Sequence, residues 1–269
     1  MNSETSETYS QAAPVWEQLR FEAREAGTSE PALASYLNAA ILSQPSFAAA
    51  LGYHLAEKIA GQPLMTLQIR EICHEAYTSD PDIVIAAERD MKAVLMRDPA
   101  CVQALQPFLF FKGYMALQMH RIAHWLWQQG RDVLAFHFQS RTSELFQVDI
   151  HPATRIGSGI MFDHATGITI GETAMIGDDC SILQGVTLGG TGKESGDRHP
   201  KIGRGVLVSV GAKVLGNIQI GDKAKIAAGS VVLTDVEPLC TVAGVPAKPV
   251  GGPCAEAARN MDQSLPDTL

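Results

Sequence analysis

An aliphatic residue or Phe recurs at every sixth position between Ile150 and Val232, in three successive registers. A period of six fits neither a helix nor an alternating strand. It is typical of a hexapeptide parallel β-helix, where each unit is a short strand plus a tight corner and three units close a triangular coil of about eighteen residues. We expect the recurring side chains to point into the coil. They are Ile150, Ile156, Phe162 and Ile168; Ile170, Ile176, Ile182 and Leu188; and Ile202, Val208, Val214, Ile220, Ile226 and Val232.

The repeat is interrupted at two places. Its phase slips by two between Ile168 and Ile170, and it is lost between Leu188 and Ile202. The second interruption, GGTGKESGDRHPK, is polar and rich in glycine, so we expect it to leave the stack as a loop. Loops on rigid scaffolds concentrate binding groups, and Arg198 and His199 stand together there. A solvated insertion without a role is the alternative.

The first half of the chain has the pattern of helices. The predicted helices are one capped by Ser43 with Pro45 in its first turn and ending near Ile59, then 64–77, one starting at Asp80-Pro81 and stopped by Asp98-Pro99, then 107–129 and 132–145. A β-helix exposes strand edges and apolar side chains at an open end. A helical domain directly before the first coil is a natural cover for that end, and it can supply an oligomer interface.

Composition indicates which compartment and which partners to expect. The hydrophobic fraction is 46%, yet no apolar run approaches the roughly 20 residues that span a bilayer, so no membrane partner is expected. The start, MNSETSETYSQ, has neither a secretory nor a mitochondrial leader pattern. The five cysteines are scattered without metal-ligand spacing, which favours free thiols in a reducing, cytoplasmic compartment. A net charge of -8 argues against nucleic acid as a partner.

Two histidines and two aspartates lie in or beside the first coil. They are Asp149, His151, Asp163 and His164. Asp149 and His164 are fifteen positions apart, so in a coil of about eighteen residues they can meet across a wall and its corner. A carboxylate can then fix the imidazole tautomer while the other ring nitrogen acts as a base. An ordinary surface histidine is the alternative, and spacing alone does not decide between them.

Longer motifs carry a resemblance to a known family. Residues 146–203 contain VDIHP, DHATG, TLGGTGK and GDRHPKIG in that order, and this segment resembles bacterial serine O-acetyltransferase. Residues 110–131 and 243–251 resemble it too, so the likeness runs from about residue 10 to 251. It implies an α-helical N-terminal domain at 1–145, a left-handed parallel β-helix at 146–252 and a flexible tail at 253–269, an α+β chain whose β-helix departs from the usual right-handed crossover.

The resemblance also implies an activity with named residues. Members of the family transfer acetyl from acetyl-CoA, a co-substrate, to the hydroxyl of L-serine; the product, O-acetyl-L-serine, begins cysteine biosynthesis, and L-cysteine inhibits. No metal is implied. The carried-over residues are His164 as catalytic base; Asp149 as its orienting carboxylate; Asp98, Asp163, Arg198 and His199 for serine; and Gly190, Thr191, Ala212, Ala228 and Lys248 for the CoA groove.

Assembly and a protein partner follow from the same resemblance. It implies a homo-oligomer, a trimer of β-helices arranged as a dimer of trimers. In the family the C-terminal tail inserts a terminal isoleucine into O-acetylserine sulfhydrylase. This chain ends in Leu269, which keeps the apolar side chain and free carboxylate but lacks the β-branch. Capture of a terminal carboxylate is a known mode of peptide binding, so we expect a weaker complex.

Three other functions stay open from the residues. A β-helix acetyltransferase acting on another acceptor, such as a sugar, would share the repeats and a catalytic histidine. A β-helix carbonic anhydrase needs three histidines around one zinc ion, and the repeat region offers His151, His164 and His199, none of them as a close pair. A non-catalytic scaffold, in which the helical half recruits partners, is the third.

Overall fold

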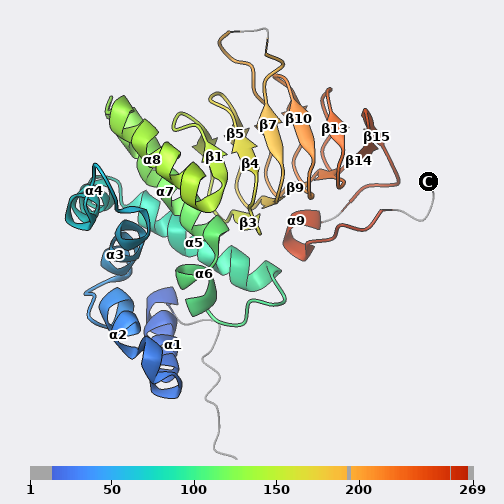
Figure 1. The fold of residues 1–269 in the computed structure, drawn as a ribbon. Coiled ribbons are helices and arrows are strands. Elements are labelled where there is room, and N and C mark those ends of the chain that lie inside the picture. The colour runs from blue at the N-terminus through green and yellow to red at the C-terminus, as the bar shows by residue number, and fades with distance from the viewer. Residues whose placement is uncertain (1–13, 193–194, 255, 266–269) are drawn as a thin grey trace, which may run out of the picture.

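The computed structural model describes residues 14–192, 195–254 and 256–265, and it has a helical half followed by a parallel β-helix (Figure 1). Leu269 lies outside the described residues. The helices of the first half are α1 Val15–Ser29, α2 Ala34–Leu37, α3 Phe47–Ile59, α4 Thr66–Ser79, α5 Asp82–Arg97, α6 Leu105–Leu109, α7 Lys112–Gln128 and α8 Asp132–Phe146. No helix within the described ranges is long and apolar enough to cross a membrane.

Two predicted helix boundaries are wrong. Helix α3 is capped by Ser46, whose hydroxyl accepts a hydrogen bond from the N–H of Ala49 at 3.2 Å. Ser43, the predicted cap, instead follows a π-helical turn over Asn38–Leu42. The single helix predicted over 107–129 is divided into α6 and α7, because Phe111 takes an extended conformation with φ -85° and ψ 107°.

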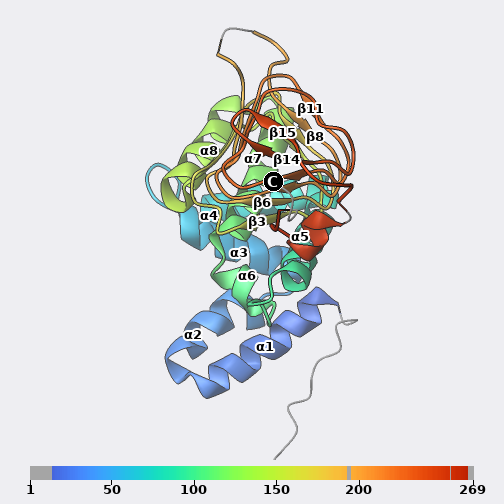
Figure 2. The same ribbon diagram turned by 90° about the vertical axis from the view of Figure 1, so that its right-hand side faces the viewer.

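The second half winds through three sheets. The first sheet has the order β1-β4-β7-β10-β13, the second β11-β8-β5-β2 and the third β15-β14-β12-β9-β6-β3. Within the described residues, the strand pairs are parallel except β14 with β15. The strands are β1 Val148–Ile150, β2 Arg155–Ile156, β3 Met161–Asp163, β4 Ile168–Ile170, β5 Met175–Ile176, β6 Ser181–Leu183, β7 Thr187–Gly189, β8 Lys201–Ile202, β9 Leu207–Val208, β10 Lys213–Leu215, β11 Gln219–Ile220, β12 Lys225–Ile226, β13 Val231–Val232, β14 Thr241–Gly244 and β15 Ala247–Pro249. Figure 2 views the stack with its coils superimposed.

The strand register confirms the period of six and locates its interruptions. Ile170 pairs with Leu188, eighteen positions on, but Ile150 pairs with Ile170, twenty positions on. The two extra residues fall in the corner between β3 and β4, which holds the DHATG motif. Leu188 pairs with Val214, twenty-six positions on, because the predicted loop leaves the coil after β7. Except for the half-buried Ile156, every recurring residue of the repeat is buried.

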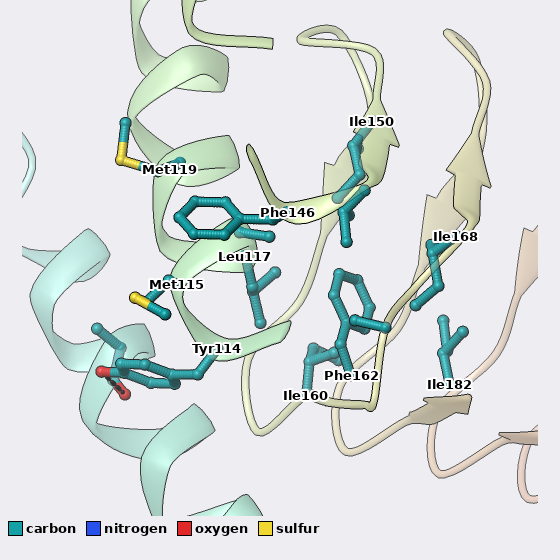
Figure 3. Close-up of a cluster of buried hydrophobic side chains, with 14 of the residues drawn as sticks. Tyr114, Met115, Leu117, Met119, Phe146, Ile150, Ile160, Phe162, Ile168 and Ile182 are labelled. Atoms are coloured by element: carbon teal, nitrogen blue, oxygen red, sulfur yellow. Dashed lines mark hydrogen bonds between the residues drawn. The ribbon is translucent and has the colours of Figure 1, made fainter. Parts of the chain in front are cut away.

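The helical half covers the first coil, as predicted. Helices α7 and α8 contact β1, and α5 and α7 contact β3. Figure 3 shows side chains from both halves in one core, with Leu117 of α7 and Phe146 of α8 beside Ile150 and Phe162 of the first coil. The apolar interior of the β-helix therefore continues into the helical half without a solvent layer.

A buried polar cluster joins the same elements. Asp90 of α5 is fully buried; its carboxylate accepts hydrogen bonds from the Arg121 guanidinium at 2.7 Å and from the N–H of Ile160 at 2.9 Å. Arg121 also donates to the carbonyl of Gly157 at 2.7 Å. Breaking such a buried pair leaves an uncompensated charge, so this cluster fixes how the two halves meet.

The structure differs from the flexible tail predicted after Gly252. Residues Ala257–Asn260 form a short helix, α9, whose Ala257 and Ala258 are buried. Ser181 of β6 donates to the carbonyl of Ala258 at 2.9 Å, and Lys225 pairs with Asp262 at 3.0 Å. The small alanines lie against Leu183 and Leu207, an apolar contact that the polar composition of the tail concealed.

Candidate active site

The corner between β3 and β4 presents His164. Its two extra residues force an unusual backbone, with positive φ at both His164 (54°) and Ala165 (61°). Positive φ is uncommon outside glycine and often marks a functional constraint. The His164 side chain is 72% exposed, and its Nε2 lies 3.8 Å from Oδ1 of Asp163. The ring thus lies beside the Asp163 carboxylate and is otherwise largely open to solvent.

Asp98 joins this corner from the helical half. It caps the C-terminus of α5, and its carboxylate accepts a hydrogen bond from the N–H of Ala100 at 2.8 Å. Burial raises the pKa of the Asp163 carboxyl; His164 opposes that rise and the negative charge of Asp98 adds to it. Two carboxylates that repel each other in a partly buried place suit a cationic group between them.

Asp149 is held by a different partner from the predicted one. It lies on β1 opposite Thr169 of β4, and its carboxylate accepts a hydrogen bond from the Gln139 amide of α8 at 2.7 Å. Within the described ranges, the structure gives Asp149 no hydrogen bond to His164. The orienting role of Asp149 therefore stays a prediction.

Arg198 and His199 lie at another corner, at the end of the loop that leaves the coil after β7. Arg198 donates to Glu172 at 2.7 Å, and Nδ1 of the buried His199 meets the Thr173 hydroxyl at 2.9 Å. Burial lowers the pKa of His199, and the Arg198 charge lowers it further. The Arg198 guanidinium likewise holds the pKa of Glu172 below its usual range through their hydrogen bond.

The predicted base and the predicted serine ligands therefore fall into two groups. Asp98, Asp163 and His164 gather where the third sheet passes into the first, whereas Arg198 and His199 lie where the first sheet passes into the second. The loop projects from the stack beyond β7 (Figure 1). A single chain does not bring the two groups to one point.

Glu172 and Thr173 were missed by the sequence reading. They follow Gly171 at an ordinary corner, and nothing in their local sequence marks them. Only the register reveals them, because Met175 pairs with Lys201, twenty-six positions on, and Glu172 meets Arg198 at the same spacing. That offset depends on the loop length and could be used only once the pairing was known.

Two of the predicted CoA residues lie beside a row of glycines at the same corner of the coil as His164. Gly167, Gly185, Gly211 and Gly229 stack there with φ between 67° and 77°. A Cβ added at Gly185 would lie 3.5 Å from Cα of Gly211, so successive coils are closely apposed. The predicted groove residues Ala212 and Ala228 directly adjoin these glycines; Ala212 is buried and Ala228 exposed. The ladder leaves a smooth strip that leads away from His164 along the stack.

The remaining predicted groove residues are more scattered. Gly190 and Thr191 start the projecting loop, where Cγ2 of Thr191 would lie 3.5 Å from a Cβ at Gly216. Lys248 lies on β15 with an exposed side chain. A separate hollow of about 760 Å³ runs along the second sheet past Ile176, but none of the predicted site residues lines it, so concavity alone does not locate the site.

A zinc centre finds no support in the geometry. The charge of His151 contributes to the lowered pKa of His199, so these two lie near each other, but His164 is at a different corner. Across the described part of the chain, no three His, Cys, Asp or Glu side chains are grouped in a way that could hold a metal ion.

Known families match both halves of the chain. The family described as "Serine acetyltransferase, N-terminal" matches residues 15–119, and "Bacterial transferase hexapeptide (six repeats)" matches residues 199–234. Over 250 residues the chain is 53% identical to a serine acetyltransferase of Salmonella typhimurium, which covers 93% of this chain and 92% of the relative.

Solved structures give the same likeness in three dimensions. The serine acetyltransferase of Neisseria gonorrhoeae in complex with serine has a TM-score of 0.87 and 50% identity, over 89% of this chain and 98% of that one. A serine acetyltransferase in complex with cysteine scores 0.92 at 51% identity, over 93% and 98%. That of Brucella abortus in complex with coenzyme A scores 0.89 at 49% identity, over 91% and 98%.

Proposed function

The chain belongs to the serine acetyltransferase family, and we propose that its own residues transfer an acetyl group from acetyl-CoA to the hydroxyl of L-serine, with His164 as the base. The observation that carries the proposal is the convergence of Asp98, Asp163 and His164 at the corner that two extra residues create. The product, O-acetyl-L-serine, is the first intermediate of cysteine biosynthesis, and L-cysteine inhibits by occupying the serine pocket.

His164 supplies the proton transfer that the reaction needs. A serine hydroxyl is a poor nucleophile at neutral pH, and a positioned neutral imidazole accepts its proton as the oxygen attacks the thioester carbonyl. Such assistance contributes roughly 10²–10⁴ in rate. The exposed His164 ring is free to meet an incoming hydroxyl. Asp149 orients the ring once substrate is bound, which requires it to leave or share its hydrogen bond with Gln139.

Side chains of opposite charge bind the ammonium and the carboxylate of serine. Asp98 and Asp163 receive the ammonium group, which relieves their mutual repulsion. Arg198 offers a planar guanidinium that suits the carboxylate, and His199 adds a hydrogen bond. The developing oxyanion needs an N–H donor, and the backbone from Gly189 to Gly192 is the candidate. Acetyl-CoA lies along the glycine ladder beside Ala212 and Ala228, with Gly190, Thr191 and Lys248 at its margins.

A second copy of the chain completes the site. The Arg198 corner and the His164 corner are separated in one β-helix, so a cyclic trimer that places one chain's loop against its neighbour's His164 brings the groups together. We propose this trimer, paired through the helical halves into a hexamer, in the cytoplasm. Binding to O-acetylserine sulfhydrylase through Leu269 belongs to the same proposal.

The proposal is tested by coenzyme A release. Purified protein is mixed with acetyl-CoA and either L-serine, glucosamine or buffer, and free thiol is followed. We expect release with serine alone, and inhibition by millimolar L-cysteine at sub-saturating serine. Release with glucosamine would favour a sugar acetyltransferase, and release with neither would favour a scaffold.

A further inference from the structure

Asp98 is the one proposed substrate ligand that comes from the helical half, so its position depends on how α5 is attached to the β-helix. We propose that the preceding residue, Arg97, is a positioning residue that holds Asp98 against Asp163 and thereby sets the affinity for serine. The inference rests on the proposed function and deepens it, because it assigns a role in substrate recognition to a side chain that does not touch substrate.

Arg97 bonds to the β-helix rather than to its own half. Its Nη1 donates to the carbonyl of Cys180 at 3.1 Å and to the hydroxyl of Ser181 at 3.2 Å. Its Nη2 lies 3.6 Å from Oδ1 of Asp179. The residue is 93% buried, since its exposed fraction is 7%. The planar Arg97 guanidinium thus faces oxygen atoms on three consecutive residues, 179 to 181. The flexible ammonium of a lysine cannot reproduce this geometry.

The strand that receives Arg97 is the neighbour of the strand that carries Asp163. Strand β6 pairs with β3, with Ser181 opposite Met161 and Leu183 opposite Asp163. Arg97 therefore fixes the end of α5 to the same sheet from which Asp163 projects. Asp98 follows directly as the C-cap, and its own N–H is bonded to the carbonyl of Val94 at 2.9 Å, so it cannot move independently of the helix end.

Helix α5 has a second attachment to the β-helix, seven residues before Arg97. The docking of the helix can therefore be separated from the positioning of Asp98. Asp90 receives the N–H of Ile160 at 2.9 Å and carries the ion pair with Arg121. This contact already docks the helix on the first coil. Without Arg97 the helix would remain docked at Asp90 while its C-terminal turn, with Asp98, became free to shift relative to Asp163.

The test compares Arg97→Gln with a matched control, Arg89→Gln. Arg89 lies on the same helix and faces the same Asp179 at 3.9 Å, but its side chain is 47% exposed and the contact is a long ion pair rather than a set of hydrogen bonds. We expect Arg97→Gln to raise the KM for serine roughly tenfold, the size of one lost charge-assisted hydrogen bond, with the KM for acetyl-CoA within about twofold. The serine KM of Arg97→Lys should lie between those of the parent and Arg97→Gln. Arg89→Gln should change neither the serine KM nor the acetyl-CoA KM.

A double variant shows whether Arg97 acts through Asp98. If it does, Arg97→Gln adds little to the effect of Asp98→Asn, because coupled residues are non-additive. Should Arg97→Gln fail to fold, Asp179→Asn serves instead: it removes only the exposed carboxylate, keeps a residue that tolerates the φ of 61°, and is expected to raise the serine KM about threefold.

The inference fails if both KM values rise equally, or if kcat alone falls in step with the folded fraction, because either result would mean a purely structural role. It also fails if serine affinity is unchanged in both Arg97→Lys and Asp179→Asn. Serine-dependent thiol release by the unaltered protein tests the proposed function separately. If that release occurs and Asp98→Asn raises the serine KM while Arg97→Gln does not, the proposed function stands and this inference fails.

Discussion

The β-helix and the helical half place their side chains by different means. In the β-helix, position follows from register: each coil repeats the one before it, and the proposed site residues appear where the repeat is lengthened, as at His164 and at the loop that ends in Arg198 and His199. In the helical half, position follows from attachment, since Asp98 ends a helix, α5, that is bonded to Ile160 just before β3 and to Ser181 of β6. The contrast suggests where to look for candidate site residues. In the β-helix they lie at insertions into the repeat, and in the helical half they lie next to buried polar contacts.

The largest effect is expected at the lengthened corner. His164→Ala should reduce acetyl transfer by roughly 10²–10⁴, the contribution of a general base. Because the side chain is 72% exposed, the thermal midpoint and the affinity for coenzyme A should be unchanged. Serine-dependent thiol release and calorimetry with coenzyme A measure the two properties. Retention of more than about a tenth of the activity would remove His164 from the role of base.

Replacing Asp90, which attaches α5 to the first coil, should lower the stability of the protein. Asp90→Ala leaves the Arg121 guanidinium buried without its carboxylate, and the expected loss is about 3–5 kcal/mol of unfolding free energy. Denaturant unfolding measures it, with the exposed Asp82→Ala on the same helix as control. A loss no larger than that of the control would show that the contact between the two halves does not depend on this pair.

Replacing Asp163 should weaken serine binding while it stabilises the fold. Burial raises the pKa of its carboxyl in the folded state, so ionisation there disfavours folding, and this unfavourable contribution appears as the pH rises through the folded pKa. Asp163→Asn should therefore raise the thermal midpoint slightly at pH 8, and less at pH 4, while the serine KM rises roughly tenfold. A variant that is less stable than the parent at pH 8 would contradict the assignment of a buried, repelled carboxylate.

The smallest effect is expected where the helical half reaches the outer face of the first coil. Gln139→Leu removes the amide that bonds Asp149 at 2.7 Å, and we expect acetyl transfer to change by only a few-fold, less than in Asp149→Asn. The exposed neighbour Ser140→Ala is the control. If Gln139→Leu matched Asp149→Asn in full, the two residues would act as one unit rather than as carboxylate and support.

Much of the β-helix could be predicted from sequence because its core is periodic. One buried side chain per six residues is a signal that survives in a single chain, and the slip of two that it shows between Ile168 and Ile170 comes from two extra residues that the structure places at the His164 corner. The motifs of the family then named the site residues. The same reading missed what depends on contacts far apart in sequence: the Glu172–Arg198 pair and the Gln139–Asp149 bond.

Helix boundaries failed for a related reason. Ser43 and Ser46 are both acceptable caps by residue type, and the choice is made by which hydroxyl meets a free N–H. The packing of α9 was hidden because two alanines carry little hydrophobic signal until a complementary surface, here Leu183 and Leu207, is known. The first choice depends on local hydrogen-bond geometry and the second on tertiary contact, and neither is visible in residue type alone.

The position of α9 has a consequence for the order in which the protein is made. Its residues contact α5 and β9 and receive a hydrogen bond from Ser181, although they follow every coil in the chain. During synthesis the helical half emerges first and offers the first coil an apolar face on which to form, and each later coil needs only its predecessor as a template. The contacts of α9 cannot close until every coil before it has been synthesised. A ribosome that stalls inside the repeat would therefore carry a nascent chain whose outermost coil still exposes its unpaired strand edges.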